Sequence, residues 1–416
     1  MSEYPTYFDT QVVGAGPGGL GVAIGAEHEG VLPDLLGEGL LFIDSGKHFG
    51  LGKLPEYAIR SNSAWSDLYE AIDPEGEYKS VIEWARSEKN QSSLVPLESV
   101  GGLLHQLGEL TQMQLELTEN SGFMPVTHIE STVIGHDGSF TTYDTWGEPV
   151  ARSRTIVFST GSGEELHPIN TPYKDKTILS HDVLTGNEDV MDQLRQGAAC
   201  GKIIVEGGSH SSYSAADKLR SELPGLEEGQ IVVVQKRPSA LFYPSIDAAQ
   251  VGGYTFDPVG DVCPDTQRVH RYGGIRGDAK DLYLAVSDGS ERRVAQQIVP
   301  NLKAAQPLLE DAAVIVQALG YQVNEIPIYT RDGQRIGPVR IKGRVEVTDN
   351  SQIRSGIGSR RIIPGAYGLG LGYGVLPNAR IGGEPNTGGR PVDSVNMFHG
   401  PVGRNIAQQL VSSRRG

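Results

Sequence analysis

The residues with the most recognisable chemistry lie near the amino terminus, where an apolar strand at residues 11–13 runs into a turn rich in glycine. The turn reads Gly14, Ala15, Gly16, Pro17, Gly18, Gly19. At this spacing the first glycine allows the sharp bend, the second lets the backbone approach a diphosphate, and the third lets the next helix pack on the strand. Free N–H groups and a partial positive charge gather at the start of that helix. The pattern therefore predicts a dinucleotide site.

An acidic residue follows the next strand. The apolar run at residues 40–43 ends at Asp44, and a carboxylate in this position suits the hydroxyl pair of a ribose. The gap of 30 residues between Gly14 and Asp44 exceeds the usual spacing of ~20. The surplus fits the loop at residues 29–39.

A second strand and turn repeat the pattern. After the strand at residues 203–205 the turn reads Gly207, Gly208, Ser209, His210, Ser211, Ser212. Ser209 and Ser212 replace the second and third glycines, and their small side chains keep close approach to a phosphate possible while their hydroxyls offer donors. We interpret His210 as a phosphate-side or packing residue, because no second ligand has metal-binding spacing with it.

Basic residues follow the strand after this turn. The strand at residues 231–234 leads into Lys236 and Arg237. Cationic groups here suit a 2′-phosphate and favour NADPH over NADH. The alternative is that both are solvated surface charges.

Composition limits the classes of function. A chain of 416 residues predicts two or three domains, and the net charge of −15 argues against nucleic acid and anionic membranes as partners. The two cysteines, Cys200 and Cys263, form no CxxC pair, so neither a dithiol centre nor a cysteine-rich metal site is predicted. The polar N-terminus lacks an apolar h-region, so we expect no secretion signal, and no apolar run is long enough to predict a membrane span. We expect a cytoplasmic protein that binds no metal and that can form a homo-oligomer.

The order of motifs resembles the two-dinucleotide-binding flavoproteins, and most closely the flavin-containing and N-hydroxylating monooxygenases. The motifs in chain order are GAGPGGL, IDSG, IVFSTG, ILSHDVL, VEGGSHSSYSAA, VIVQALGY and a glycine-rich close. The resemblance implies an α/β fold with two Rossmann-like domains, the NADPH domain inserted into the FAD domain. It predicts an FAD domain at 1–170, an NAD(P)H domain at 171–311 and a return of the FAD domain at 312–416.

The resemblance also assigns site residues. It implies that Gly14, Gly16 and Gly19 hold the FAD diphosphate and Asp44 its ribose. Gly207, Ser209 and Ser212 match the NADPH turn. The crossings between domains match Thr160, Gly161, Leu319, Gly320, Tyr321, and the phrase at residues 178–181 matches the opening of the NADPH domain.

Further candidates come from less regular segments. By the resemblance Asn62 falls where relatives place polar groups beside the flavin, and it is the candidate catalytic residue; the alternative is that it caps the following helix. Asp393 lies at the start of a helix predicted over 396–410, whose N–H groups would face an electron-rich ring edge. Arg271 and Arg276, in the aromatic segment at 242–278, would hold a substrate carboxylate or the NADPH phosphate, unless they are surface residues.

The implied reaction is a monooxygenation. NADPH would reduce the flavin, O₂ would add at C4a, and the hydroperoxide would pass one oxygen to a small molecule, plausibly an amine nitrogen. The Baeyer–Villiger fingerprint is absent and the substrate insertions of the ornithine and lysine hydroxylases cannot be matched. The alternatives are an NAD(P)H-dependent flavin reductase or dehydrogenase without oxygen insertion, and a non-oxygenating FAD-binding partner protein.

Overall fold

The first glycine turn follows a strand of the larger of the two main sheets. The computed structural model describes residues 5–88, 91–356 and 360–414. Within them this sheet has ten strands in the order β17-β16-β6-β7-β8-β1-β2-β5, with β21 beside β8 and β20 beside β21. Its strands are β1 (Tyr7–Val13), β2 (Leu40–Ile43), β5 (Gly122–Met124), β6 (Ile129–Ile134), β7 (Phe140–Asp144), β8 (Pro149–Phe158), β16 (Ile328–Thr330), β17 (Arg335–Gly337), β20 (Gln352–Arg354) and β21 (Ile362–Gly368).

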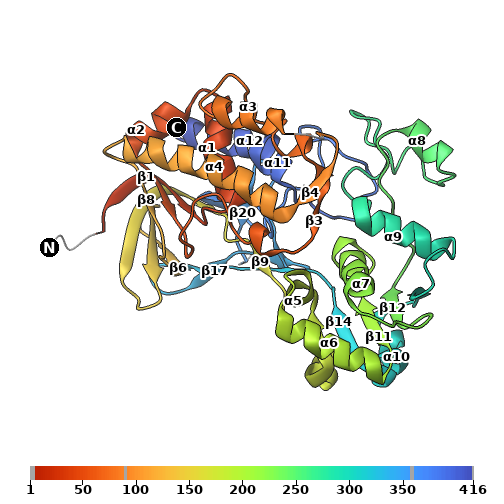
Figure 1. Ribbon diagram of the computed structural model, residues 1–416. Coiled ribbons are helices and arrows are strands. Elements are labelled where there is room, and N and C mark those ends of the chain that lie inside the picture. Colours follow the sequence, from red (N-terminus) through yellow and green to blue (C-terminus); the bar gives the residue numbers. More distant parts are fainter. Residues whose placement is uncertain (1–4, 89–90, 357–359, 415–416) are drawn as a thin grey trace.

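Helices cover one face of this sheet (Figure 1). The helices of this unit are α1 (Pro17–His28), α2 (Leu32–Glu38), α3 (Lys79–Ser87), α4 (Leu97–Glu116), α11 (Val395–His399) and α12 (Pro401–Ser412). Successive side chains of a strand point to opposite faces, so Val12 joins the core under the helices while Val13 joins the core on the other face. Because both faces are covered, β1 and β2 are apolar without interruption towards their carboxyl ends.

Glycines allow α1 to lie against the C-terminal helices. A Cβ atom on Gly21 would be 2.3 Å from the carbonyl oxygen of Phe398, and one on Gly25 would be 2.3 Å from the carbonyl carbon of Gly403. Real Cβ atoms do not approach backbone so closely. The helix pair therefore depends on these small residues, and the return of the chain to the first sheet is fixed by backbone contact.

Replacement of Gly25 by alanine should lower the free energy of unfolding by about 1–3 kcal/mol, the usual cost of overpacking. Gly102 in α4 has no atom within 4 Å of the equivalent Cβ position, so Gly102→Ala is the matched control and should be neutral or slightly stabilising. Urea unfolding of both variants checks this. Equal stabilities would show that α1 and α12 are free to separate.

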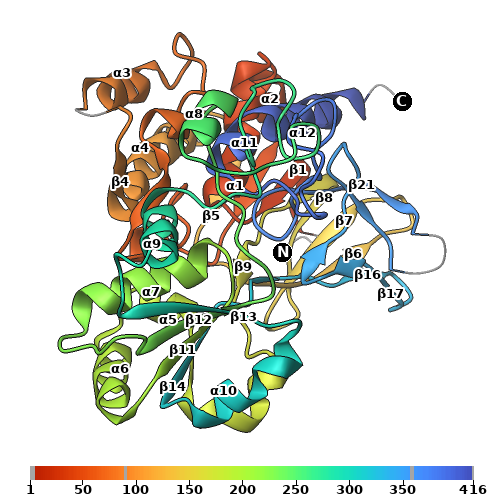
Figure 2. The same cartoon turned by 90° about the vertical axis from the view of Figure 1, so that its right-hand side faces the viewer.

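The smaller sheet has five parallel strands in the order β10-β14-β11-β12-β13. They are β10 (Thr177–Leu179), β11 (Ile203–Glu206), β12 (Ile231–Gln235), β13 (Val294–Ile298) and β14 (Val314–Gln317). The helices α5 (Ser180–Leu184), α6 (Glu188–Cys200), α7 (His210–Glu222), α8 (Ile246–Val251) and α9 (Gly277–Ser287) precede α10 (Gln306–Asp311). Figure 2 shows α7 and α10 on opposite sides of the sheet, each over its own apolar cluster.

The predicted α/β architecture with two Rossmann-like units is therefore confirmed. One detail differs from the predicted division at residue 311: β14 pairs with β10 and β11, so the smaller sheet extends to Gln317. A parallel strand needs a neighbour on its sheet, and the sequence alone did not show which sheet β14 would join.

The two crossings between the units lie side by side. Strand β9 (Ser162–Gly163) of the outgoing segment pairs with β15 (Gln322–Val323) of the returning segment. The Asn324 backbone N–H donates to the carbonyl oxygen of Gly161, and its side-chain amide donates to that of Thr160, both at 3.0 Å. The larger unit is thus discontinuous in sequence and closed by this pair of strands. No helix in the described ranges is both long and apolar enough to cross a membrane.

Candidate active site

The first glycine turn has the tight geometry that its sequence predicts. Gly14 has φ of 100°, and a Cβ atom there would lie 2.2 Å from the carbonyl oxygen of Ser159. On Gly19 a Cβ atom would lie 1.9 Å from the carbonyl oxygen of Gly14. Gly16 is the N-cap of α1 and Pro17 is its first residue, where a missing N–H costs nothing. The helix begins with free N–H groups beside a cradle that any side chain would fill.

Asp44 braces this turn from the end of β2. Its Oδ2 accepts a hydrogen bond from the Ala15 backbone N–H at 2.5 Å, and its Oδ1 accepts one from Gly46 at 2.6 Å. The carboxylate is half-buried at the predicted position, in direct contact with the turn. Contact with a ribose stays a prediction.

The second glycine turn opens α7. Gly207 has φ of 132°, and a Cβ atom there would lie 2.4 Å from the carbonyl oxygen of Ala318, on the returning crossing. Ser209 and Ser212 form a capping box: the Ser209 N–H donates to the Ser212 hydroxyl at 3.0 Å, and this hydroxyl donates to the Ser209 carbonyl at 2.8 Å. Ser212 is fully buried, so its hydroxyl is occupied by the turn, while Gly207, Gly208, Ser209 and Ser211 face a cavity.

His210 links two helix starts. Its Nε2 accepts a hydrogen bond from the backbone N–H of Arg276, the N-cap of α9, at 3.1 Å. Burial, and then the charges of Arg276 and Arg390, lower the pKa of His210 to about 3. The ring is therefore neutral at physiological pH. The ring lines the cavity beside the turn, and its interpretation as a phosphate-side or packing residue stays a prediction. No cluster of metal-ligating side chains occurs in the part of the chain that the structure describes.

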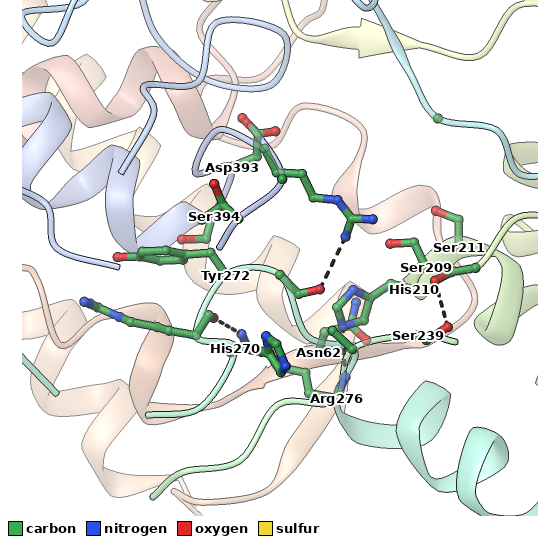
Figure 3. A pocket seen from close by; sticks show the side chains of 18 of the residues that line it. Asn62, Ser209, His210, Ser211, Ser239, His270, Tyr272, Arg276, Asp393 and Ser394 are labelled. Carbon is green, nitrogen blue, oxygen red and sulfur yellow. Dashed lines mark hydrogen bonds between the residues drawn. The ribbon is translucent and has the colours of Figure 1, made fainter. Parts of the chain in front are cut away.

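A cavity of about 1540 Å³ lies between the two units. Figure 3 shows Asp393, Ser394 and Tyr272 on one side of it and Ser209 and Ser211 on the other. Of the predicted residues it brings together Asn62, Asp393 and a larger set: Gly207, Gly208, Ser209, His210, Ser211, Lys236, Arg237, Arg271, Arg276, Leu319, Gly320 and Tyr321. The first glycine turn, Asp44, Thr160 and Gly161 lie outside its lining.

The first turn is nevertheless joined to this cavity. A Cβ atom on Gly18 would lie 3.0 Å from the Cα of Gly370, and the next residues, Leu371 and Gly372, line the cavity. A group seated on the first turn therefore has a short path into the space that the second turn faces. No residue of this glycine loop was predicted as a site residue from the sequence. The run Gly-Leu-Gly-Leu-Gly-Tyr-Gly is the signal that could have indicated it.

Asn62 lies in β3 (Arg60–Ala64), which pairs with β4 (Leu94–Pro96). The next helical turn, Ser66–Leu68, has Trp65 as its N-cap and no side-chain cap. The alternative interpretation of Asn62 as a helix cap is therefore wrong. Its amide makes no hydrogen bond to another described residue and borders the cavity.

Asp393 also lines the cavity but has a partner. It forms an ion pair with Arg344, and its Oδ1 is buried without a hydrogen bond to any described residue. Burial raises the pKa of Asp393, and Arg344 opposes this effect. The predicted helix at 396–410 is two helices, α11 and α12, because the helical conformation is interrupted at Gly400, before Pro401.

Leu319, Gly320 and Tyr321 lie on the returning crossing, where Tyr321 makes a polar contact with the larger unit. The Tyr321 hydroxyl lies 3.2 Å from that of Tyr57, which in turn is 3.1 Å from Nδ1 of His181. The predicted phrase at 178–181 thus reaches the larger unit through one tyrosine. Lys236 and Arg237 are exposed at the end of β12 and form no ion pair with any described residue.

A buried histidine supports the first turn and gives a pH prediction. Nε2 of His399 donates to the carbonyl oxygen of Pro17 at 3.0 Å, and burial lowers the pKa of His399 to about 4. Below pH 6.5 His399 takes up a proton in the unfolded chain but stays neutral in the folded chain. The free energy of unfolding therefore falls as the pH falls from 6.5 towards 4. At pH 5 the loss is about 2 kcal/mol. His399→Gln should remove this part of the slope.

Urea unfolding at pH 7 and pH 5 measures that difference. His136 is exposed, and His136→Gln is the matched control that should keep the wild-type decrement. If His399→Gln and the wild type lost equal stability on acidification, the buried neutral ring would not be the cause.

Comparisons with known proteins agree with this geometry. No family model matches the chain. A curated protein of Streptomyces rubellomurinus, named CMP-5'-(3-aminopropyl)phosphonate hydroxylase, is 27% identical over 441 residues, covering 99% of each chain.

Solved structures share the fold over the whole length. L-lysine 6-monooxygenase from Pseudomonas syringae superposes with a TM-score of 0.60 at 13% identity, covering 98% of this chain and 99% of the other. Ornithine N-hydroxylase from Kutzneria sp. 744, solved with reduced FAD, NADP⁺ and L-ornithine, has a TM-score of 0.56 at 14% identity, covering 99% and 100%. The predicted resemblance to the fold of N-hydroxylating flavoprotein monooxygenases is confirmed.

Proposed function

We propose that the protein is an FAD-dependent, NADPH-using monooxygenase that hydroxylates an amine nitrogen of a small molecule. The observation that carries this proposal is the cavity between the units, which joins the second glycine turn to the loop seated on the first. Two dinucleotides held on the two turns would present their reactive rings to one shared space. We place the reaction in the cytoplasm, where NADPH is supplied.

The first turn fits FAD on the evidence of its backbone. Gly14 and Gly19 exclude any side chain because backbone oxygens occupy the Cβ positions, while at Gly16 the nearest atom is 3.3 Å away, the Cα of Gly52. This leaves a backbone ledge at the start of α1 that a diphosphate can reach. The likeness in fold over the full length to an ornithine N-hydroxylase solved with reduced FAD supports the same assignment. The name of the curated relative specifies a hydroxylase and includes an aminopropyl group.

When bound, FAD would accept hydride from NADPH and activate O₂. The balance of the whole reaction is R–NH₂ + O₂ + NADPH + H⁺ giving R–NHOH + H₂O + NADP⁺. The chain supplies binding, orientation and shelter from water. Asn62 borders the cavity with a free amide, which can hold a donor or acceptor of the substrate. Neutral His210 fixes the distance between the second turn and α9.

The test is a comparison of products. Purified protein loaded with FAD is mixed with NADPH in air, with and without 3-aminopropylphosphonate or its CMP conjugate, and hydroxylamine, H₂O₂ and NADPH are quantified. Hydroxylamine formed in proportion to NADPH supports the proposal. NADPH oxidation that yields only H₂O₂ with every amine would favour the flavin reductase, and a flavin bleached by neither nicotinamide would favour a non-oxygenating FAD-binding protein.

A further inference from the structure

The cavity wall carries an excess of cationic groups. Its basic side chains are Lys236, Arg237, Arg268, Arg271, Arg276, Arg344 and Arg390, against the carboxylates Asp67, Glu70, Asp261 and Asp393. Of these cations, only Arg344 forms an ion pair with a described residue. The acidic groups have other partners: Asp67 accepts from the Ala64 N–H, and Glu70 from the Asn396 amide. Six of these seven cations therefore have no ion-pair partner among the described residues.

These cations fall into two groups. The first group contains Arg237, Arg344 and Arg390, since desolvation, and then the charges of Arg237 and Arg344, lower the pKa of Arg390. This group adjoins the end of β12, where the sequence predicts the 2′-phosphate of NADPH. Desolvation lowers the pKa of Arg276 also, Asp67 opposes this, and Arg268 and Arg271 lower it further. The second group is thus Arg276 together with Arg268 and Arg271, which lie close enough to Arg276 to repel its charge.

The loop that bears the second group is rigidly built. Fully buried Glu384 accepts hydrogen bonds from the backbone N–H groups of Tyr272, at 3.1 Å, and Gly273, at 2.7 Å. Gln267 and His270 adopt the left-handed region with φ of 56° and 45°, a conformation that costs of order 1–3 kcal/mol for residues other than glycine. The fold therefore holds this loop in one conformation despite the free-energy cost of these two backbone conformations.

The guanidinium groups are positioned by rings and backbone rather than by acids. That of Arg271 lies 4.8 Å from the ring centre of Tyr272, and that of Arg276 lies 4.0 Å from that of Phe242. Arg276 also donates to the carbonyl oxygen of Arg271. Arg271 also donates from Nη1 to Sγ of Cys263 at 3.6 Å. Each guanidinium thus has one engaged N–H group and further N–H groups that could bind a tetrahedral oxyanion in pairs.

The second group lies within reach of the candidate catalytic residue. Arg60 forms an ion pair with Asp278, and this contact joins β3 to the first turn of α9. Asn62 is two residues from Arg60 and Arg276 is two residues from Asp278, and both face the cavity (Figure 3). One short molecule can therefore contact both.

We propose that Arg268, Arg271 and Arg276 form a subsite for a phosphate or phosphonate group carried by the amine substrate, an inference that rests on the function proposed above. Three guanidinium groups exceed what one carboxylate neutralises, whereas a phosphonate approaches two negative charges near pH 7. The cationic wall also disfavours an ammonium group, so it holds more of the bound amine in the neutral, nucleophilic form.

Calorimetric titration of the FAD-loaded protein tests the subsite. We expect 3-aminopropylphosphonate to bind at least tenfold more tightly than its carboxylate analogue 4-aminobutanoate. Arg271→Gln and Arg276→Gln should each weaken the phosphonate about 10- to 100-fold, as for a lost charged hydrogen bond, with NADPH affinity and FAD content unchanged. Arg237→Gln is the matched control and should weaken NADPH alone. Arg271→Lys should recover part of the phosphonate affinity.

Three results would overturn the subsite: equal affinity for the two analogues, no measurable phosphonate binding, or loss of NADPH affinity in Arg271→Gln and Arg276→Gln. These results are separable from failure of the proposed function. Arginine-dependent phosphonate binding in a protein that forms no hydroxylamine would refute the function and support the subsite. Hydroxylamine formation that is indifferent to Arg271 and Arg276 would do the reverse.

Discussion

Gly16→Ala should give a folded protein that no longer retains FAD. Residue 16 has φ of −71° and ψ of −166°, which alanine adopts without strain, and the nearest atom to the new Cβ is 3.3 Å away. The methyl group instead fills the ledge that a diphosphate must approach. Loss of two charge-assisted hydrogen bonds costs about 3–6 kcal/mol, or roughly 10²- to 10⁴-fold in affinity.

The measurement is the ratio of flavin to protein after purification, with circular dichroism as the check on folding. Gly102→Ala, in open space on α4, is the control and should keep the full flavin content. A yellow Gly16→Ala protein with wild-type stoichiometry would remove the first turn from the diphosphate site, and with it the basis of the proposed function.

Lys236→Ala combined with Arg237→Ala should abolish the preference for NADPH over NADH. Both side chains are exposed on the cavity wall and have no ion-pair partner among the described residues, so their removal strands no buried charge. We expect the KM for NADPH to rise about 10- to 100-fold, the low end for two charged hydrogen bonds in a solvated place. The KM for NADH should stay within about twofold, since NADH has no 2′-phosphate.

Steady-state kinetics with both nicotinamides measure this switch. Arg292 is exposed elsewhere on the smaller unit, and Arg292→Ala serves as the charge-matched control with no expected change. A parallel rise in both KM values, or none in either, would mean that Lys236 and Arg237 are the solvated surface charges of the alternative interpretation.

Local chemistry made the two turns predictable. A strand followed by glycines at fixed spacing allows few backbone conformations. A Cβ atom at several of these glycines would clash with backbone only a few residues away or on the adjacent strand. For this reason strand β2, the position of Asp44 and the start of α7 agree with the sequence. The fold class followed from the same repetition of strand, turn and helix.

Other assignments needed the chain in space. Ser212 has the spacing of a phosphate ligand, yet its hydroxyl is engaged by Ser209 in the capping box. Strand β14 joined the smaller sheet, beyond the predicted division, because its partners β10 and β11 lie over a hundred residues away in the chain. Arg271 and Arg276 had two open roles in the sequence, and only their neighbours separate them from the group at the end of β12.

By itself the sequence determined where backbone must approach phosphate, because that requirement acts within a few residues and is written as glycine. The convergence of Asn62, the second turn, the glycine loop after β21 and an arginine-bearing loop on one cavity was decided by tertiary structure alone. Charge and shape at that cavity are sums over segments far apart in the chain, and no local pattern records which of them will meet.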